Sequence, residues 1–503
     1  MRWQDDLRED YQDLAALAMS FRNDMEQFAS EAERVRADVR PRTIDDVFAF
    51  VASLRAMYEE IEREAAALGC SCGASFDSSH DGLAKKKRDL IDRLRSIRGI
   101  AASVAVSLDW QSPAFAHSRY SQAGIETGKI NATFNDYKRD FHGDARRFER
   151  AFDEQFLHRQ GMWRPNVRAV SSGMAAFTTA LEAVFMSNIP RGPVLIGSGT
   201  YFQSKAIVER LIPDRIEINE ADISSAVEAV RAHAPSLIIL DTLCNTEGII
   251  VPPLRDLLCR ISAHLKKPTA VIFDNTGFGP AYNPVRDIPR GSLLRPVVFE
   301  SLAKYYQHGM DRVTGGILWA PPWSGFDLFS SRMHLGTNIP DASVRAIPAP
   351  NRGLLLRRFQ RFERNALWLA QEFDRFARSH RTLISHVNYP GLRSHPAFDY
   401  LSGRPFHGSF FTVTFRPMFR HPKIFLAWLR AVVKEAKKDG LDVCAGSSFG
   451  FDTTRVYLTA LHADHLTRPF VRVSAGTETC VEIKKICEAL KRASKKTFGL
   501  IHP

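Results

Sequence analysis

The stretch Val297-Val-Phe-Glu-Ser-Leu-Ala-Lys-Tyr-Tyr-Gln-His-Gly-Met-Asp-Arg-Val-Thr-Gly-Gly316 decides how the rest of the chain is interpreted. Its apolar beginning, from Pro296 to Phe299, predicts a buried strand that ends at Ser301. Lys304 follows three residues later. In α/β proteins the functional groups gather where the strands end, so Lys304 is expected at the mouth of a sheet.

A second apolar run lies upstream and ends in a carboxylate. Thr269-Ala-Val-Ile-Phe-Asp274 predicts another buried strand, with Asp274 at its end. An aspartate at one strand end and a lysine at another are what a pyridoxal phosphate (PLP) site requires, because the lysine holds the aldehyde and the aspartate keeps the ring nitrogen protonated. The alternative, a solvated loop lysine, is the more common fate of such a residue taken alone.

Three motifs in a fixed order make the interpretation more specific. Ser301-Leu-Ala-Lys304-Tyr, Asp274-Asn-Thr and Ser172-Gly-Met-Ala-Ala resemble the lysine segment, the ring-nitrogen aspartate and the phosphate turn of one enzyme family. This is the cystathionine γ-synthase-like, or Cys/Met metabolism, family of fold-type I PLP enzymes. The resemblance implies an α/β fold with a mostly parallel central sheet, and a smaller α+β domain at the C-terminus.

The resemblance also implies the remaining cofactor contacts. The amides of Gly173 and Met174 and the hydroxyl of Ser301 would bind the phosphate, Tyr201 would stack on the ring, and Asn245 would contact the ring hydroxyl. For Tyr201 a packed core tyrosine is the alternative. Asn245 is also a candidate substrate contact.

The segment His117-Ser-Arg119-Tyr corresponds to an arm that the family extends into the neighbouring subunit. Arg119 would bind the phosphate of the partner's cofactor, since a guanidinium gives an anion two parallel hydrogen bonds. His117 stands where the family has tyrosine, and it joins Lys304 and Tyr201 as a candidate catalytic residue. A homodimer or homotetramer with shared active sites is therefore expected; a surface arginine is the alternative for Arg119.

Near the C-terminus, Val471-Arg472-Val-Ser-Ala-Gly resembles the family segment that binds the substrate carboxylate. Arg472 is the expected ligand, with Ser447 nearby. An arginine in a buried strand needs a partner, so an internal ion pair is the alternative for Arg472.

We expect four parts along the chain: a helical extension over residues 1–105, the arm over 106–165, a PLP-binding large domain over 166–348, and a small domain over 349–503. Apolar residues at helical spacing between Leu14 and Ile61 predict long helices in the extension, about which the resemblance is silent. The extension's apolar stripes are expected to pack on each other, on the body or on a second subunit.

Bulk composition narrows the function. The 503 residues are 45% hydrophobic, enough for globular cores, and no apolar run is long enough to cross a membrane. The seven cysteines are scattered, and Cys70, Cys72 and His80 lack zinc-site spacing, so neither disulfides nor a metal are expected. The net charge of +12 is spread among acidic residues, which favours an anionic small molecule over nucleic acid. We expect a cytoplasmic protein.

The resemblance implies a reaction through an external aldimine and a carbanion. The favoured reaction is γ-elimination or γ-replacement on an amino acid with a leaving group on Cγ. The alternatives are a divergent γ-lyase acting on a halogenated amino acid, a β-lyase acting on a cystathionine-like substrate, and a non-catalytic scaffold. Two departures from the family stand beside Lys304: Ala303 replaces a threonine, and Gln307-His-Gly-Met-Asp311 replaces Asn-Gly-His-Ser-Asp. Weaker cofactor retention is expected unless another group compensates.

Overall fold

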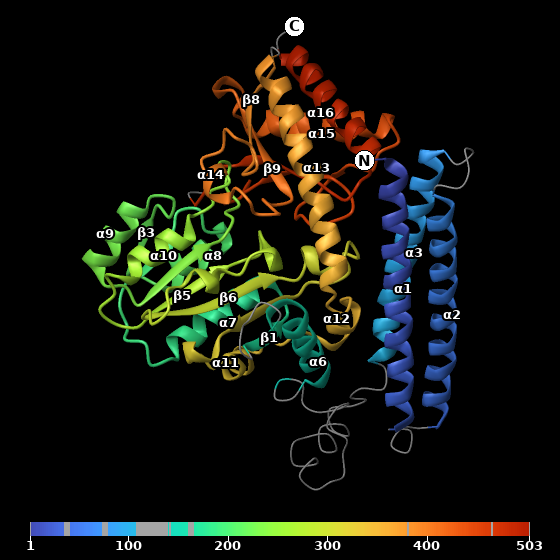
Figure 1. Cartoon of the computed structure of the whole chain (residues 1–503), viewed down its shortest axis with the longest axis horizontal. Coiled ribbons are helices and arrows are strands. Elements are labelled where there is room, and N and C mark those ends of the chain that lie inside the picture. The colour runs from blue at the N-terminus through green and yellow to red at the C-terminus, as the bar shows by residue number, and fades with distance from the viewer. Residues whose placement is uncertain are drawn as a thin grey trace.

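The computed structural model describes residues 2–34, 41–72, 79–106, 139, 142–158, 165–379, 382–463 and 466–501. A helical bundle, a large layered body and a smaller C-terminal unit are visible in Figure 1. His117 and Arg119 lie outside the described residues, so the predictions for them remain predictions.

The N-terminal bundle consists of three long helices, α1 (Trp3–Arg34), α2 (Pro41–Ser71) and α3 (His80–Ala105). Their apolar stripes face one another and form a core of their own, including Leu14, Phe21 and Tyr58. Helix α2 continues past Gly69, and α3 continues past Arg98 because the alanine-rich residues that follow are strong helix formers.

Within the described residues, the body is built on a seven-stranded sheet in the order β1-β7-β6-β5-β4-β2-β3. Only β7 runs antiparallel to its neighbours, which confirms the mostly parallel sheet. The strands are β1 (Asn166–Val170), β2 (Val194–Gly197), β3 (Arg215–Ile218), β4 (Leu237–Asp241), β5 (Thr269–Asp274), β6 (Leu294–Ser301) and β7 (Gly316–Ala320). The two predicted strands that lead to Asp274 and Ser301 are therefore confirmed and lie side by side.

Helices cover both faces of this sheet, and alternate strand residues enter two separate cores. Val271 and Phe273 of β5 face one core, while Ala270 and Ile272 face the other. The first core is closed by α6 (Gly143–Phe152), α9 (Ile223–His233) and α10 (Leu254–Ser262), and the second by α7 (Gly173–Phe185), α8 (Phe202–Leu211) and α11 (Leu328–Leu335). Because both faces are buried, the central strands β2, β4 and β5 are largely apolar, whereas the edge strand β3 alternates.

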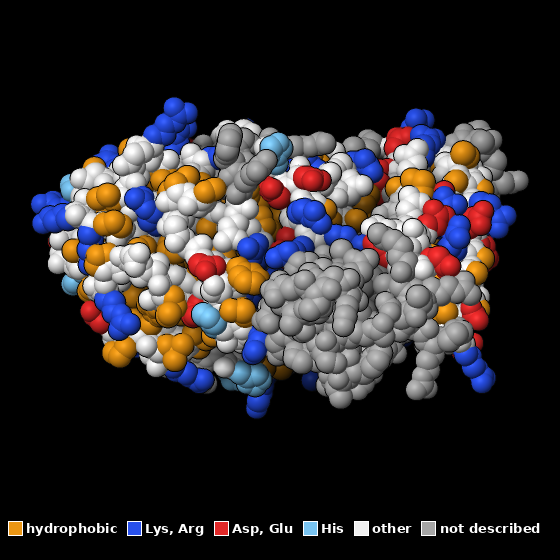
Figure 2. All heavy atoms as spheres, turned by 90° about the horizontal axis from the view of Figure 1, so that it is seen from below, with side chains coloured by type: hydrophobic (Ala, Val, Ile, Leu, Met, Phe, Trp, Pro, Cys, Tyr) orange, Lys and Arg blue, Asp and Glu red, His pale blue; other side chains and the backbone are white. Residues whose placement is uncertain are grey.

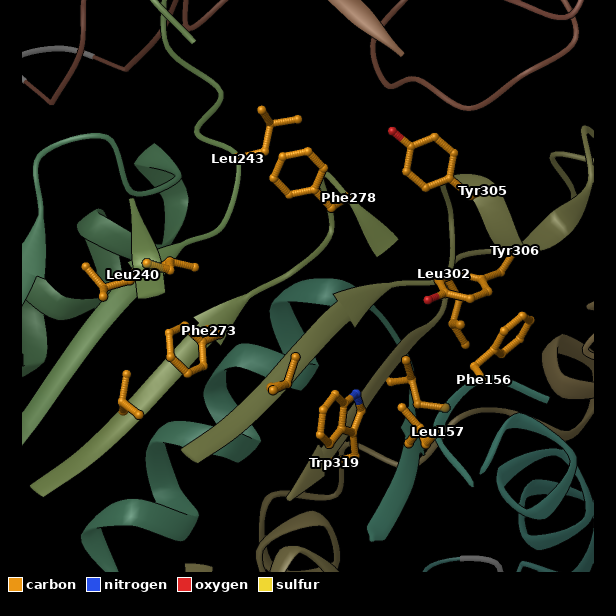
Figure 3. Packing of buried hydrophobic residues seen from close by; sticks show 14 of the residues in the cluster. Phe156, Leu157, Leu240, Leu243, Phe273, Phe278, Leu302, Tyr305, Tyr306 and Trp319 are labelled. Carbon is orange, nitrogen blue, oxygen red and sulfur yellow. The ribbon is translucent and has the colours of Figure 1, made fainter. Parts of the chain in front are cut away.

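The residues directly after Lys304 belong to the first core. Tyr305 is fully buried, and Tyr306 packs edge-on against Phe156 (Figure 3). Burying two aromatic rings next to the lysine fixes the backbone on its C-terminal side. The packing thus holds Lys304 at the edge of a rigid core.

Helix α13 (Arg352–Ser379) runs from the body into the C-terminal unit. That unit has the five-stranded sheet β10-β11-β12-β9-β8 among the described residues. Its elements are β8 (Ile384–Asn388), β9 (Phe410–Phe415), α15 (Pro422–Lys438), β10 (Cys444–Ala445), β11 (Arg455–Thr459), β12 (Phe470–Ser474) and α16 (Cys480–Ile501). Helices α15 and α16 lie on this sheet and share its core.

The surface is mixed in charge. On the face drawn in Figure 2, Lys and Arg side chains are interspersed with Asp and Glu, most clearly on the bundle. Among the described helices, none combines the length and apolarity needed to span a bilayer.

Candidate active site

A cavity of about 410 Å³ opens where the parallel strands of the body end and the C-terminal unit begins. Its lining contains every predicted site residue that the structure describes: Gly173, Met174, Tyr201, Asn245, Asp274, Ser301, Lys304, Ser447 and Arg472. These residues come from seven separate stretches of sequence. The fold therefore brings together what the motifs only suggested.

Lys304 lies just after β6, and its Nζ donates a 2.7 Å hydrogen bond to Oγ of Ser448. The aromatic ring of Phe449 lies 5.3 Å from the same nitrogen. Burial, and after it the charge of Arg472, lowers the pKa of Lys304 to about 8, although Asp274 opposes the change. A lysine with this pKa is partly neutral near physiological pH, as a nucleophile or base must be.

Two carboxylates stand in register at the ends of β4 and β5. Asp241 and Asp274 are paired residues, and both line the cavity. Burial and the charges of Asp274 and Glu220 raise the pKa of Asp241 well above its usual value. Burial also raises the pKa of Asp274, although the hydrogen bonds from Thr276 and the Lys304 cation oppose the rise. Two buried carboxylates this close favour one shared proton or an added cation.

The carboxylates differ in what already binds them. Oδ2 of Asp241 accepts a hydrogen bond from the backbone N–H of Tyr201, whereas Oδ1 of Asp274 accepts from the N–H of Thr276. Thr276 also accepts from the backbone N–H of Ser301 through its hydroxyl, at 3.0 Å. The turn after β5 thereby fixes Asp274 against Ser301. Thr276 was not among the predicted site residues.

The predicted phosphate turn begins helix α7. Ser172 is its N-cap, with Oγ accepting from the N–H of Ala175 at 3.0 Å. The next residue must be small: a Cβ on Gly173 would lie 2.9 Å from the Cβ of Ser301. The first-turn amides of Gly173 and Met174 therefore lie beside the Ser301 hydroxyl at a helix N-terminus, an arrangement suited to a phosphate.

Arg472 lies on β12, is 5% exposed, and is held by neutral groups. Its Nη1 donates to Oδ1 of Asn245 at 2.8 Å, and its Nη2 donates to the carbonyl of Ser448 at 3.1 Å. No carboxylate of the described residues pairs with it, and its buried Nε has no partner among them. Burial lowers the pKa of Arg472 to about 10. A buried cation in this state is suited to a carboxylate ligand.

Ser448, not the predicted Ser447, makes the contacts inside the cavity. Ser447 is exposed at the rim, and its carbonyl accepts from Arg455 at 2.9 Å. Ser448 has a positive φ of 77°, which turns its hydroxyl toward Lys304. The geometry favours Ser448 for the substrate contact predicted at Ser447. The difference between these two adjacent serines arises from the backbone angle of Ser448.

The cavity has the features that PLP needs. It contains a buried amine, a carboxylate at the end of the neighbouring strand, a glycine-containing helix start and, among the described residues, an arginine without an acidic partner. Orphaned buried polar groups of this kind are expensive unless a ligand completes them.

Comparison with known proteins agrees with this geometry. Residues 106–491 match the family described as Cys/Met metabolism PLP-dependent enzyme. The chain belongs to this family. The resemblance found in the motifs and the PLP cofactor are thus confirmed, and the fold is fold-type I.

Solved structures share the fold at low sequence identity. The structure of metB from Corynebacterium glutamicum is 19% identical, with a TM-score of 0.56 over 72% of this chain and 87% of that one. Cystathionine gamma synthase from Xanthomonas oryzae pv. oryzae, solved with cystathionine, is 20% identical, with a TM-score of 0.56 over 74% and 90%. CalE6, a methionine gamma lyase from Micromonospora echinospora, is 19% identical, with a TM-score of 0.53 over 71% and 88%.

Among curated proteins, the bifunctional enzyme flvA of Aspergillus flavus is 24% identical over 341 residues. The match covers 66% of this chain and 39% of that enzyme, so this chain spans about two fifths of its length. The bundle of α1, α2 and α3 precedes the region matched by the family.

Proposed function

We propose that this protein catalyses a PLP-dependent γ-elimination or γ-replacement on an amino acid that carries a leaving group on Cγ. The observation that carries the proposal is the convergence of Lys304, Asp274 and Arg472 on one cavity. The names of the solved relatives, a γ-synthase and a γ-lyase, support this reaction class.

When bound, PLP supplies an electron-accepting ring that stabilises negative charge on the carbon beside the substrate nitrogen. Asp274 would hold the ring nitrogen protonated. The amides of Gly173 and Met174 and the hydroxyl of Ser301 would hold the phosphate, completed by Arg119 of a neighbouring subunit, as the resemblance implies. Tyr201 would cover one face of the ring.

Lys304 is the proposed proton carrier. With a pKa of about 8, its amine can take the proton at Cα and pass it to another atom of the bound substrate or to water; the free amine can then take a second proton at Cβ and deliver it to the departing group. The hydroxyl of Ser448 lies within hydrogen-bond reach of this amine and would hold it in position between transfers. Moving protons at both carbons is what allows a group on Cγ to leave.

Arg472 would bind the substrate carboxylate with Nε and the remaining hydrogen-bonding capacity of its guanidinium. Asn245 holds Nη1 and so orients the guanidinium plane toward the cavity. The flanking rings of Phe410 and Phe449, 5.3 and 5.5 Å away, exclude water from this cation. The resulting ion pair would fix the amino acid with its side chain directed to the cavity opening.

Loading the purified protein with PLP and supplying a panel of amino acids tests the proposal. Homocysteine, methionine, cystathionine and the O-esters of homoserine should each release a four-carbon 2-oxo acid by γ-elimination or give a product substituted at Cγ by γ-replacement. Lys304→Ala should lose both the visible absorption band of the bound cofactor and the turnover. Release of pyruvate from cystathionine would indicate a β-lyase instead. Wild-type protein that shows no absorption band of bound PLP after the excess is removed would contradict the proposal that the protein is a PLP enzyme.

A further inference from the structure

One arginine of the N-terminal bundle reaches two segments that line the active site. Arg95 on α3 donates to the carbonyl of Gly309 from Nε at 3.0 Å and from Nη2 at 2.5 Å. Its Nη2 also lies 3.5 Å from Oδ2 of Asp452. Gly309 belongs to the loop that begins at Lys304, and Asp452 follows the turn that contains Ser448. The two segments are thus joined through a part of the chain that precedes the family region.

The loop after Lys304 has an unusual backbone. His308, Gly309 and Asp311 have φ values of 48°, 83° and 48°. Left-handed conformations cost a residue with a side chain about 1 kcal/mol or more and persist where the surroundings hold them. Within the loop, Gln307 binds the carbonyls of Leu302 and Val313; the outward carbonyl of Gly309 is bound by Arg95.

Gly309 and Met310 are matched to this contact. A Cβ on Gly309 would lie 2.2 Å from Oδ2 of Asp452, so no larger residue fits. Met310 is 1% exposed and is part of the hydrophobic core of the bundle. These are the positions where Gly-Met replaces the family's His-Ser. The departures from the family therefore coincide with the place where the bundle docks.

Asp452 is itself held by the long helix α13 and by the segment after β12. It pairs with Arg358 of α13 at 2.7 Å and accepts from the hydroxyl of Thr477 at 3.1 Å. Burial alone would raise the pKa of Asp452, but Arg358, Arg95 and Lys87 outweigh burial and hold it below its usual value. Two residues before it, Gly450 packs so closely that a Cβ would lie 2.8 Å from the carbonyl carbon of Lys304.

We propose that the N-terminal bundle is an intramolecular brace for the active-site lysine, with Arg95 as its positioning residue. The brace holds the loop from Lys304 to Asp311 and the turn from Ser448 to Asp452 in one fixed relation. It compensates for the phosphate donor lost at Ala303 by keeping the cofactor pocket closed. The inference rests on the proposed function for its cofactor, but not on the substrate.

The test uses the full-length protein with Arg95→Met, which keeps the aliphatic stem and removes the donors. Arg93→Met is the matched control, because among the described residues Arg93, on the same helix, pairs with Glu60 and Glu64 of the bundle alone, at 3.2 and 3.0 Å. The main readout is the rate at which the loaded protein loses PLP after dilution, followed by absorbance. Arg95→Met should lose PLP about tenfold faster, as removal of a charged hydrogen bond predicts, and Arg93→Met should match wild type.

Further readouts separate positioning from general damage. Arg95→Met should lower kcat more than it raises KM, and hydrogen exchange should accelerate in residues 304–312. Arg95→Lys keeps one donor for the Gly309 carbonyl, so it should lose PLP more slowly than Arg95→Met. If Arg95→Met does not fold, the comparison of wild type with Arg95→Lys remains the test, and wild type should lose PLP more slowly. Equal retention in all variants would overturn the brace even if wild type turned over substrate. Wild type that retains PLP without turnover would overturn the proposed reaction and leave the brace intact.

Discussion

Ser448 binds Lys304 and Arg472 at the same time: its hydroxyl accepts from the lysine ammonium at 2.7 Å, and its carbonyl accepts from the guanidinium at 3.1 Å. One residue thus couples the proposed proton carrier to the proposed carboxylate ligand. Its left-handed backbone keeps both groups pointed into the cavity.

Ser448→Ala should shift the titration of Lys304. The hydroxyl stabilises the charged amine, so its loss should lower the pKa further below about 8, by up to about one unit. Covalent attachment of PLP requires the neutral amine, so the attachment rate in wild type should rise as pH increases through about 8 and then level off. The midpoint from stopped-flow absorbance should move to lower pH in the variant. An unchanged midpoint would show that the hydrogen bond does not act on this amine.

Asp274→Asn should lower kcat by about 100-fold or more, because a neutral amide cannot hold a positive charge on the ring nitrogen. Steady-state kinetics of the PLP-loaded variant measure this. Asp241→Asn should have a smaller effect, since the amide oxygen can still accept from the N–H of Tyr201. Equal losses in the two variants would contradict the assignment of Asp274 to the ring nitrogen.

Arg472→Lys should raise KM for amino-acid substrates by about 30-fold, corresponding to ~2 kcal/mol for a charged hydrogen bond, with a smaller change in kcat. A lysine keeps the charge but not the planar pair of donors. The binding of a simple amine without a carboxylate, followed by the cofactor spectrum, provides the control. If the substitution weakens binding of the amine as much as binding of the amino acid, Arg472 acts on the fold rather than on the substrate carboxylate.

Mixing Lys304→Ala with Arg119→Ala tests whether active sites are shared. If Arg119 completes the neighbour's phosphate site, each variant alone is inactive, but a mixed dimer has one intact site. Unfolding and refolding the two together should therefore restore about a quarter of wild-type activity for random pairing in a dimer. Refolding each variant alone is the control, and no recovery in the mixture would place Arg119 in its own subunit's site or outside any site.

Glu300→Gln should change how stability depends on pH. Burial raises the pKa of Glu300 to about 8, although hydrogen bonds from Tyr306 and Asn275 oppose the rise. Because the folded-state pKa is raised, the contribution of Glu300 to the free energy of unfolding is fully present below the unfolded-state pKa of 4.5 and is lost as pH rises through about 8. Between these two values the free energy of unfolding falls by about 1.4 kcal/mol per pH unit. Urea unfolding at several pH values should show a flatter profile in Glu300→Gln, and no change in the exposed Glu228→Gln.

The sequence was most informative where a motif and a strand end coincide. Asp274, Lys304 and Arg472 could be placed because long apolar runs or a long motif fixed their positions, and the structure brings all three to one cavity. The choice between Ser447 and Ser448 could not be made, since it depends on one backbone angle. The strand β7 was not predicted because its apolar run, Ile317 to Ala320, is only four residues long and follows two glycines.

The docking of the bundle could not be predicted from the amphipathic stripes alone. Those stripes predict that α1 to α3 bury an apolar face, but not which part of the chain completes it. The signal was present elsewhere, in the substitution of Gly309 and Met310 near the lysine. It had no interpretation until the structure placed Met310 in the core of the bundle.

The close approach of Gly309 to Asp452 has a consequence for protein engineering. Residues 1–105 are not an independent module: beside them, a histidine at position 309 would collide with Asp452, and a serine at position 310 would leave a hole in the core of the bundle. A working chimaera has to carry Gly309 and Met310 along with residues 1–105, so these two distant pieces of sequence have to be transferred together.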